Sequence, residues 1–193
     1  MEIFPLRASA PPRLKSVSPL CALCGSVANF SLACDPKWHP ISSMKQLPHT
    51  HSCFVCGESN PVGLNLRFET DGHVVRTRFT PRPEHIGFKQ VVHGGIIATL
   101  LDEIMVWACV AQTQKFAYCA ELTVRFLSPL RPGEETVASA ELVTNRRDKI
   151  FEAKAELKDS TGKTLATATG KYLPVKDLEL SDMAGDLVTA PGQ

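Results

Sequence analysis

The most apolar stretch of the chain, residues 91–111, carries two acidic residues at its centre. It reads VVHGGIIATLLDEIMVWACVA, and from Ile96 to Ala111 nearly every residue other than Asp102 and Glu103 is apolar. A helix that is apolar around most of its circumference has to be covered on most sides. A carboxylate taken out of water destabilises a fold by several kcal/mol unless a partner compensates it. The fold must therefore enclose this helix and still give two carboxylates polar surroundings.

Length and charge limit what the chain can be. It has 193 residues, 44% hydrophobic and 21% charged, with a formal net charge of +1, which is typical of one soluble domain with tails. Near-neutral charge gives no indication of a nucleic acid or an anionic membrane as a partner. The continuous apolar run is shorter than about 18 residues and is interrupted by the acidic pair, so we expect a core helix rather than a membrane span. Seven cysteines, an odd number in a chain that can build a core, favour a reducing, cytoplasmic location over a disulfide scaffold.

The two ends differ in composition from the middle. Residues 1–43 are rich in proline, serine and arginine and then become apolar without periodicity. Three interpretations stay open: a secretory signal, which Glu2 and several prolines disfavour; an organelle transit segment; and a disordered extension or misplaced start upstream of Met44. Residues 176–193 are acidic, and we expect a flexible tail there. The domain itself is predicted to span residues 44–175.

The pattern within the domain predicts strands on both sides of one long helix. Residues 64–70 and 73–79 alternate around an Asp71-Gly72 turn, which indicates a hairpin. Four more strands are expected over residues 118–130, 135–147, 149–159 and 163–175. Strands joined by tight turns form antiparallel sheets. We therefore predict an α+β domain in which a curved antiparallel sheet wraps one central helix.

The start of the helix suits an oxyanion. Gly94 and Gly95 place the first free backbone N–H groups of the helix at the positive end of its dipole, and they have no side chains to keep a ligand away. Such donors stabilise negative charge that develops on a reacting oxygen. The alternative is that the glycines only pack the helix start against the sheet. For Asp102, the alternative is a buried carboxylate with a purely structural role.

Distance along the helix decides how these groups could cooperate. Gly94 and Asp102 are eight residues apart, so about 12 Å at 1.5 Å per residue, and one helix cannot bring both to the same carbon atom. Two antiparallel copies can, with the Gly94 end of one helix opposite Asp102 of the other. We therefore expect the site at a two-fold interface, twice per dimer.

These residues resemble the hotdog-fold acyl-CoA thioesterases, in the phenylacetate-pathway-like branch of the 4-hydroxybenzoyl-CoA thioesterase superfamily. The resemblance rests on VVHGGIIATLLDE, with CFVCGESNPVGLNLRF upstream and AELTVRFLSPLRPGE downstream, and it covers roughly residues 53–174. It implies a hotdog fold, a homodimer or dimer of dimers with shared active sites, and an acyl-CoA substrate. It implies no cofactor and no metal.

The resemblance also implies roles for individual residues. Asp102 matches the general base or nucleophile, Gly94 and Gly95 match the glycines that polarise the thioester carbonyl, and His93 matches the motif histidine. Two positions depart from the family pattern. Related enzymes often carry Asn or Gln where this chain has Gly87, so Gln90 is a candidate substitute. They often carry Ser or Thr where this chain has Cys119, which is either a small strand residue or a nucleophile.

Other clusters have two interpretations each. Cys21-x-x-Cys24 and Cys53-x-x-Cys56, with His49 and His51, invite a zinc site, but the 28 residues between the pairs exceed the usual spacing. Trp107 and Met105 are expected in the core, or along an acyl pocket. Arg146, Arg147 and Lys149 form a solvated turn or contact the phosphates of coenzyme A. Glu103 is a candidate substrate-binding residue that points a quarter turn away from Asp102.

The sequence thus favours hydrolysis of a small or medium acyl-CoA thioester. Its thiolate is a good leaving group, so a positioned water, a base and an oxyanion site suffice for this reaction. Three alternatives stay open: a non-catalytic acyl-CoA-binding protein, an acyl-thioester dehydratase or hydratase, and a metal-linked interaction module.

Overall fold

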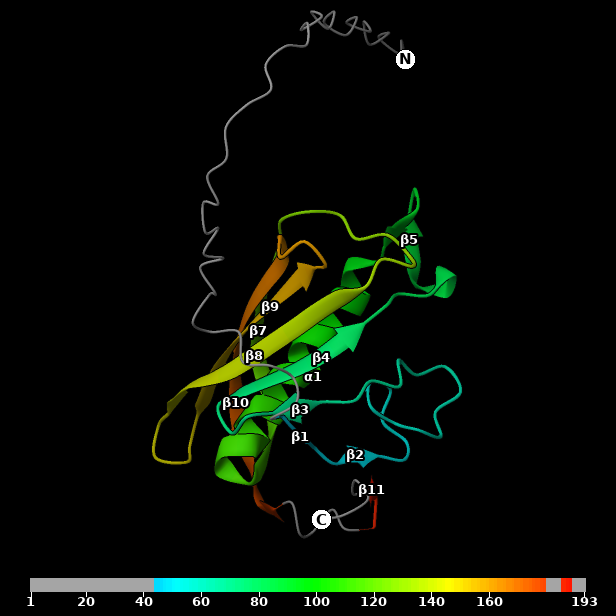
Figure 1. Cartoon of the computed structure of the whole chain (residues 1–193). Coiled ribbons are helices and arrows are strands. Elements are labelled where there is room, and N and C mark those ends of the chain that lie inside the picture. Colours follow the sequence, from blue (N-terminus) through cyan, green and yellow to red (C-terminus); the bar gives the residue numbers. More distant parts are fainter. Residues whose placement is uncertain (1–43, 180–184, 189–193) are drawn as a thin grey trace, which may run out of the picture. The chain divides into compact units, whose positions relative to one another are not determined.

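The computed structural model describes residues 44–179 and 185–188 (Figure 1). The expectations for residues 1–43, including Cys21-x-x-Cys24, fall outside this range, as does most of the predicted tail. In the described part of that tail, β10 (Thr164–Glu179) continues beyond the boundary expected at residue 175. Leu187–Val188 form the short strand β11, which pairs with β2 (His49–Thr50).

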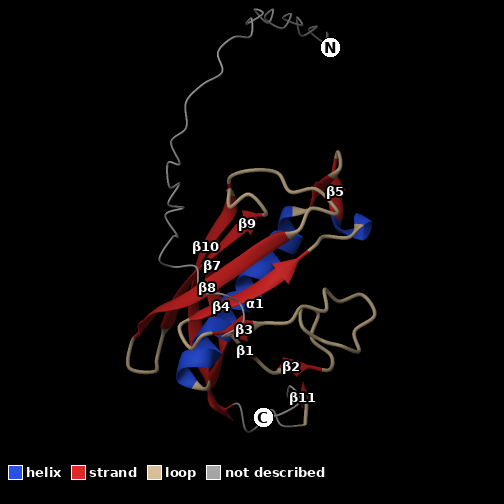
Figure 2. Ribbon diagram, viewed as in Figure 1, coloured by secondary structure: helices blue, strands red, loops and turns tan. Residues whose placement is uncertain are grey.

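A seven-stranded antiparallel sheet forms most of the described domain (Figure 2). Its strand order is β1-β3-β4-β8-β9-β10-β7. A second small sheet pairs β5 (Ile86–Phe88) with β6 (Val91–Val92), just after a 3₁₀ turn at Pro83–His85. The bounds of the other strands in the large sheet are β1 (Lys45–Gln46), β3 (Glu69–Thr70), β4 (Val74–Phe79), β7 (Lys115–Phe126), β8 (Thr136–Asn145) and β9 (Phe151–Asp159).

The hairpins form where the turn residues predicted them. Asp71 accepts hydrogen bonds from the N–H groups of His73 and Val74, at 2.9 and 2.8 Å, and Gly72 adopts a φ of 98° that other residues rarely reach. This turn sets the register of β3 and β4, with Thr70 opposite Val75. Residues 64–68, expected to continue the first strand, lie before β3 and are not part of it.

The helix α1 (Gly94–Thr113) lies against the sheet, which curves around it (Figure 1). Nine of its side chains are buried, and Leu100, Leu101, Ile104 and Met105 are completely enclosed. Trp107 is also in this core, between the rings of Phe68 and Phe116. The structure therefore confirms the α+β architecture with one long helix covered by an antiparallel sheet.

The helix is longer than the sequence argument allowed. The helix has 20 residues, and its most apolar 18 residues have a mean hydropathy of 1.7, so it is long and apolar enough for a membrane span. Half of those 18 residues, however, are buried inside the protein. The expectation that the segment is too short for such a helix is wrong. Its packing against the sheet, rather than its length, identifies α1 as a core helix.

Strand β7 lies at one edge of the large sheet, with β10 as its only neighbour in the described chain. Leu122 and Val124 pack against the core, as the alternating pattern predicted. Tyr118 and Phe126 are 70% and 54% exposed. A twelve-residue edge strand with apolar side chains in water is a surface that proteins normally cover.

One position in β10 tests the packing between sheet and helix. A Cβ atom at Gly170 would lie 2.7 Å from Cε2 of the buried Tyr172 ring, so the Gly170→Ala chain has to displace this ring. We expect a loss of about 1–3 kcal/mol in the free energy of unfolding, measured by urea denaturation. Gly185→Ala is the matched control, because a Cβ there meets no atom within 4 Å. Equal stability of the two variants would contradict this account.

Candidate functional site

The first turn of α1 is capped by its own motif histidine. The Gly95 N–H donates to Nδ1 of His93 at 2.9 Å, and the Ile96 N–H donates to the His93 carbonyl at 3.0 Å. Within the described residues, the Gly94 N–H has no protein acceptor. Of the two glycine amides expected to face a substrate, the Gly94 N–H is therefore the available one, while the Gly95 N–H holds the His93 ring in place.

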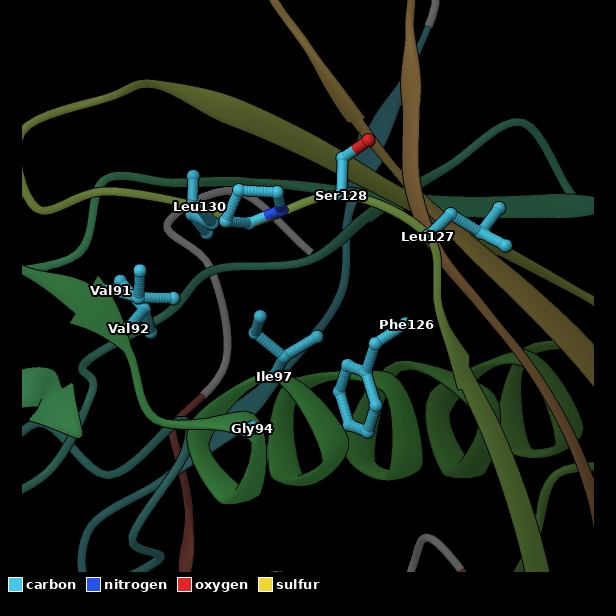
Figure 3. Close-up of a pocket in the computed structure, with 9 residues that line it drawn as sticks. Val91, Val92, Gly94, Ile97, Phe126, Leu127, Ser128 and Leu130 are labelled. Atoms are coloured by element: carbon cyan, nitrogen blue, oxygen red, sulfur yellow. The ribbon is translucent and has the colours of Figure 1, made fainter. Parts of the chain in front are cut away.

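An apolar pocket of about 350 Å³ opens beside this amide. Figure 3 shows Gly94 and Ile97 on the first turns of α1, with the Phe126 ring from the end of β7 lying against them. A Cβ atom at Gly94 would be 3.2 Å from Cζ of Phe126, so glycine gives the ring and the helix start their close approach. The remaining walls come from the end of β6 and the segment after β7, namely Val91, Val92, Leu127, Ser128, Pro129 and Leu130.

The hairpin before the helix explains why this chain has Gly87. A Cβ atom at that position would lie 3.0 Å from both Cα and Cδ2 of His93, tighter than ordinary contacts, so glycine lets β5 pass the histidine. Gln90, the candidate substitute, lies in the exposed turn between β5 and β6 with a φ of 64°. The backbone at the turn is thus unusual for a non-glycine residue.

Asp102 lies in the middle of α1 and meets two strands of the sheet. Its Oδ1 accepts a hydrogen bond of 2.9 Å from the hydroxyl of Tyr172 on β10. The thiol of Cys119, opposite Tyr172 on β7, also lies within hydrogen-bonding reach of the carboxylate. The buried phenol therefore fixes one carboxylate oxygen, and Asp102 remains partly accessible to solvent.

Burial and the Asp102 carboxylate together keep the neighbouring thiol and phenol protonated. Burial of the thiol, together with the adjacent carboxylate, raises the pKa of Cys119 to about 11. Burial and the same carboxylate raise the pKa of Tyr172 well above its ordinary value. Both groups are therefore neutral hydrogen-bond donors near pH 7. A neutral thiol is a poor nucleophile, which favours the interpretation of Cys119 as a small strand residue.

Glu103 has different surroundings from its neighbour. Its Oε1 accepts a hydrogen bond of 3.0 Å from the Trp107 indole one turn along the helix. The Sγ atom of Cys53 lies 3.7 Å from the same oxygen. Burial is the main cause that raises the pKa of Glu103 to about 7. The side chain faces Cys53, in the segment between β2 and β3, and points away from the partners of Asp102.

The structure keeps the other predicted site residues apart. Arg146 and Arg147 lie at the turn between β8 and β9, where Arg146 pairs with Glu152 at 2.7 Å. That turn contacts Lys115, just after the C-terminal end of α1, through Asp148. Gly94 is at the opposite end of the helix. Within one chain, therefore, the amide-lined end, Asp102 and the arginines form three separate places along α1.

Comparison with known proteins finds a family that part of this chain resembles. A family model for the thioesterase superfamily matches residues 89–166, which contain α1 from the His93 cap onward and most of the sheet. Residues 89–166 are therefore similar to the thioesterase superfamily. No curated protein matches the chain in sequence.

Several solved structures share the hotdog fold with this chain, among them a thioesterase-superfamily protein. One of them is 23% identical with a TM-score of 0.58, and the match covers 64% of this chain and 60% of that one. The E. coli PaaI protein from the phenylacetic acid degradation operon is 23% identical, with a TM-score of 0.53 and coverage of 58% and 80%. A Streptococcus mutans protein bound to acetyl CoA is 17% identical, with a TM-score of 0.55 and coverage of 61% and 94%. This chain thus spans less than two thirds of the first of these proteins.

Sequence reasoning did not find Tyr172. Its position in the strand gave no sign that its ring would reach across to the helix, because that contact depends on the register between β10 and β7. The one available signal was Gly170, two residues earlier on the same strand face, since the Tyr172 ring fills the space that a side chain there would need.

The cap that His93 forms at the start of α1 can be tested directly. His93→Ala leaves the Gly95 N–H without its acceptor, and we expect the free energy of unfolding to fall by about 0.5–2 kcal/mol. His93→Asn is the matched control, because an asparagine oxygen can accept the same bond. Urea denaturation of both variants measures the difference. If His93→Asn is as unstable as His93→Ala, the ring has another role than capping.

Proposed function

We propose that the protein is an acyl-CoA thioesterase that uses Asp102 as general base and the Gly94 amide as an oxyanion donor. The observation that carries this proposal is the pairing of an accessible carboxylate, fixed at one oxygen by Tyr172, with an unoccupied N–H group at the start of the same helix. The match of residues 89–166 to the thioesterase superfamily supports a thioester as the substrate.

The proposed reaction requires no covalent intermediate. Asp102 accepts a proton from a water molecule, and the water oxygen attacks the carbonyl carbon of the thioester. Negative charge develops on the carbonyl oxygen, which the Gly94 N–H and the positive end of the α1 dipole stabilise. The carbonyl then re-forms as the carbon–sulfur bond breaks and the coenzyme A thiolate leaves. The proton held by Asp102 passes to this thiolate, directly or through water, so the carboxylate is regenerated. The Tyr172 hydroxyl is a positioning group, since it bonds the carboxylate and not the substrate.

The two groups are supplied by different protomers in this proposal. Asp102 and Gly94 of one chain are about 12 Å apart along the helix axis. The exposed edge of β7 supports a homodimer, because its free backbone groups and the apolar side chains of Tyr118, Phe126 and Leu127 suit pairing with a second β7. A two-fold axis there makes the helices antiparallel, so that the Gly94 end of each faces Asp102 of the other.

The substrate class follows from the pocket and from the relatives. The pocket beside Gly94 is lined mainly by apolar side chains, which favours a small or medium acyl group over a charged one. The S. mutans structure holds acetyl CoA, and PaaI is encoded in an operon for degrading an aromatic acid. The bound acetyl CoA supports coenzyme A as the carrier. Arg146 and Arg147 remain the proposed contacts to its phosphates.

Replacement of the base tests the chemistry. We expect Asp102→Asn to lower kcat by about 100-fold or more on any acyl-CoA that the wild type hydrolyses, with KM little changed, because the amide cannot accept a proton. Thiol release from a panel of acyl-CoAs is the measurement. Asp159→Asn, the same chemical change at the last residue of β9, is the control. Saturable coenzyme A binding without turnover by the wild type would instead identify a non-catalytic acyl-CoA-binding protein.

Mixed dimers test the shared site. Gly94→Pro removes the N–H at the first helical position, which tolerates proline, and Gly94→Ala is its control because it keeps the N–H beside Phe126. After Gly94→Pro and Asp102→Asn chains are unfolded and refolded together, half of the dimers should be mixed. Each mixed dimer has one intact site, so we expect roughly a quarter of wild-type activity to return. If both groups acted within one chain, mixing would restore none.

A further inference from the structure

The segment Cys53–Gly57, which lies between β2 and β3, has the geometry of a thiolate-binding turn. The Val55 N–H donates to Sγ of Cys53 at 3.2 Å, and the Cys56 N–H faces the same sulfur. The Gly57 N–H closes the turn on the Cys53 carbonyl at 2.9 Å. A Cβ atom at Gly57 would collide with that carbonyl oxygen, so only glycine fits. Backbone N–H groups directed at a sulfur stabilise its thiolate form, which is the form that binds metals.

Both cysteines of this turn face the same carboxylate of the central helix. The sulfur atoms of Cys53 and Cys56 and a carboxylate oxygen of Glu103 all lie within 4.8 Å of one another. Cys56 is completely buried, and the other two residues are partly buried. Three side chains that can each lose a proton therefore meet in one half-buried place, although they come from positions 50 residues apart in the sequence.

This cluster lacks a compensating positive charge. Among the described residues, no lysine or arginine forms an ion pair with Glu103, whose carboxylate accepts only from Trp107 and the thiols. Arg67 is close, but its guanidinium donates to the carbonyl oxygens of Cys56 and Leu66. A divalent ion stabilises a group of thiol and carboxylate side chains that have no cation beside them, because it favours their deprotonated forms.

We propose that Cys53, Cys56 and Glu103 bind a zinc ion. Two thiolates separated by two residues are the usual half of a tetrahedral zinc site, and a carboxylate is an accepted third ligand. With Zn–S of about 2.3 Å and Zn–O of about 2.0–2.2 Å, a sulfur and an oxygen bound to one tetrahedral zinc lie about 3.5–3.7 Å apart. The observed separation of Cys53 Sγ and Glu103 Oε1 is 3.7 Å. A water molecule completes the four ligands.

The histidines considered from the sequence are not part of this site. Nε2 of His49 lies 3.2 Å from Glu58, and Nδ1 of His51 lies 3.0 Å from the same carboxylate. The third ligand comes instead from α1. The ion would therefore fasten the Cys53–Gly57 turn to the central helix, one residue after Asp102. This role is structural and does not depend on the proposed thioesterase reaction.

The test is the zinc content of the full chain. After expression in zinc-supplemented medium, we expect about one zinc per chain by elemental mass spectrometry, and near-complete loss in Cys53→Ser and Cys56→Ser. Glu103→Gln should lose most of the metal as well. Cys109→Ala, a buried cysteine elsewhere on α1, and the double variant Cys21→Ser/Cys24→Ser are the matched controls that should keep it.

Spectroscopy and stability identify the ligands even if one variant folds poorly. Replacement of zinc by Co²⁺ in the wild type should give thiolate-to-metal charge-transfer bands, and zinc-edge X-ray absorption should show two sulfur and two oxygen neighbours. Chelation should lower the Tm of the wild type by several degrees and leave the Tm of a folded Glu103→Gln chain unchanged. These readouts do not involve hydrolysis, so they fail or succeed independently of the thioesterase proposal.

Three outcomes would overturn the proposal. The first is wild-type protein without zinc that also shows no cobalt spectrum. The second is a Cys53–Cys56 disulfide in protein isolated from cells under thiol-blocking conditions, which would make the pair a redox couple. The third is zinc that is lost in the Cys21→Ser/Cys24→Ser variant or kept in full by Glu103→Gln.

Discussion

The fold depends on enclosing one apolar helix that contains two adjacent carboxylates. Because successive residues on a helix point about 100° apart, Asp102 and Glu103 cannot share the same surroundings. Asp102 faces β7 and β10 and accepts a bond from a buried phenol. Glu103 faces the Trp107 indole and the two cysteines of the Cys53–Gly57 turn. A side chain of the sheet therefore compensates Asp102, and the Trp107 indole and the Cys53–Gly57 turn compensate Glu103. Neither carboxylate is buried without a partner.

The same helix also explains why one chain is not enough for the proposed reaction. Its start offers an amide, an apolar pocket and a dipole, and its middle offers a base, but a straight helix keeps the two apart. The long exposed edge of β7 is the other unfinished feature of the single chain. One two-fold axis along β7 would cover that edge and bring the two halves of the site together. A single assembly step thus accounts for two separate observations.

Features encoded by neighbouring residues were predictable from the sequence, and features that depend on register were not. The hairpin at Asp71-Gly72, the helix and the alternating strands follow from local periodicity, and the structure confirms them. The Tyr172–Asp102 bond was missed, because it joins residues 70 positions apart through the packing of β10 on α1. The use of the Gly95 N–H by His93 was missed for a different reason: the motif gives the residues of a helix start, whereas the rotamer of His93 decides which amide stays available.

The partners of the two cysteines could not be predicted from the sequence either. Spacing along the chain joined Cys53 and Cys56 with nearby histidines, and in three dimensions Glu58 takes the histidines while Glu103 completes the group. A carboxylate in the middle of an apolar helix destabilises a core, but it is suitable as a metal ligand, because a bound cation compensates its negative charge. Bound in this way, Glu103 would fix the rotation of α1 relative to the preceding turn. Since Asp102 is the preceding residue on the same rigid helix, its direction toward β7 and β10 would be fixed by the same ion.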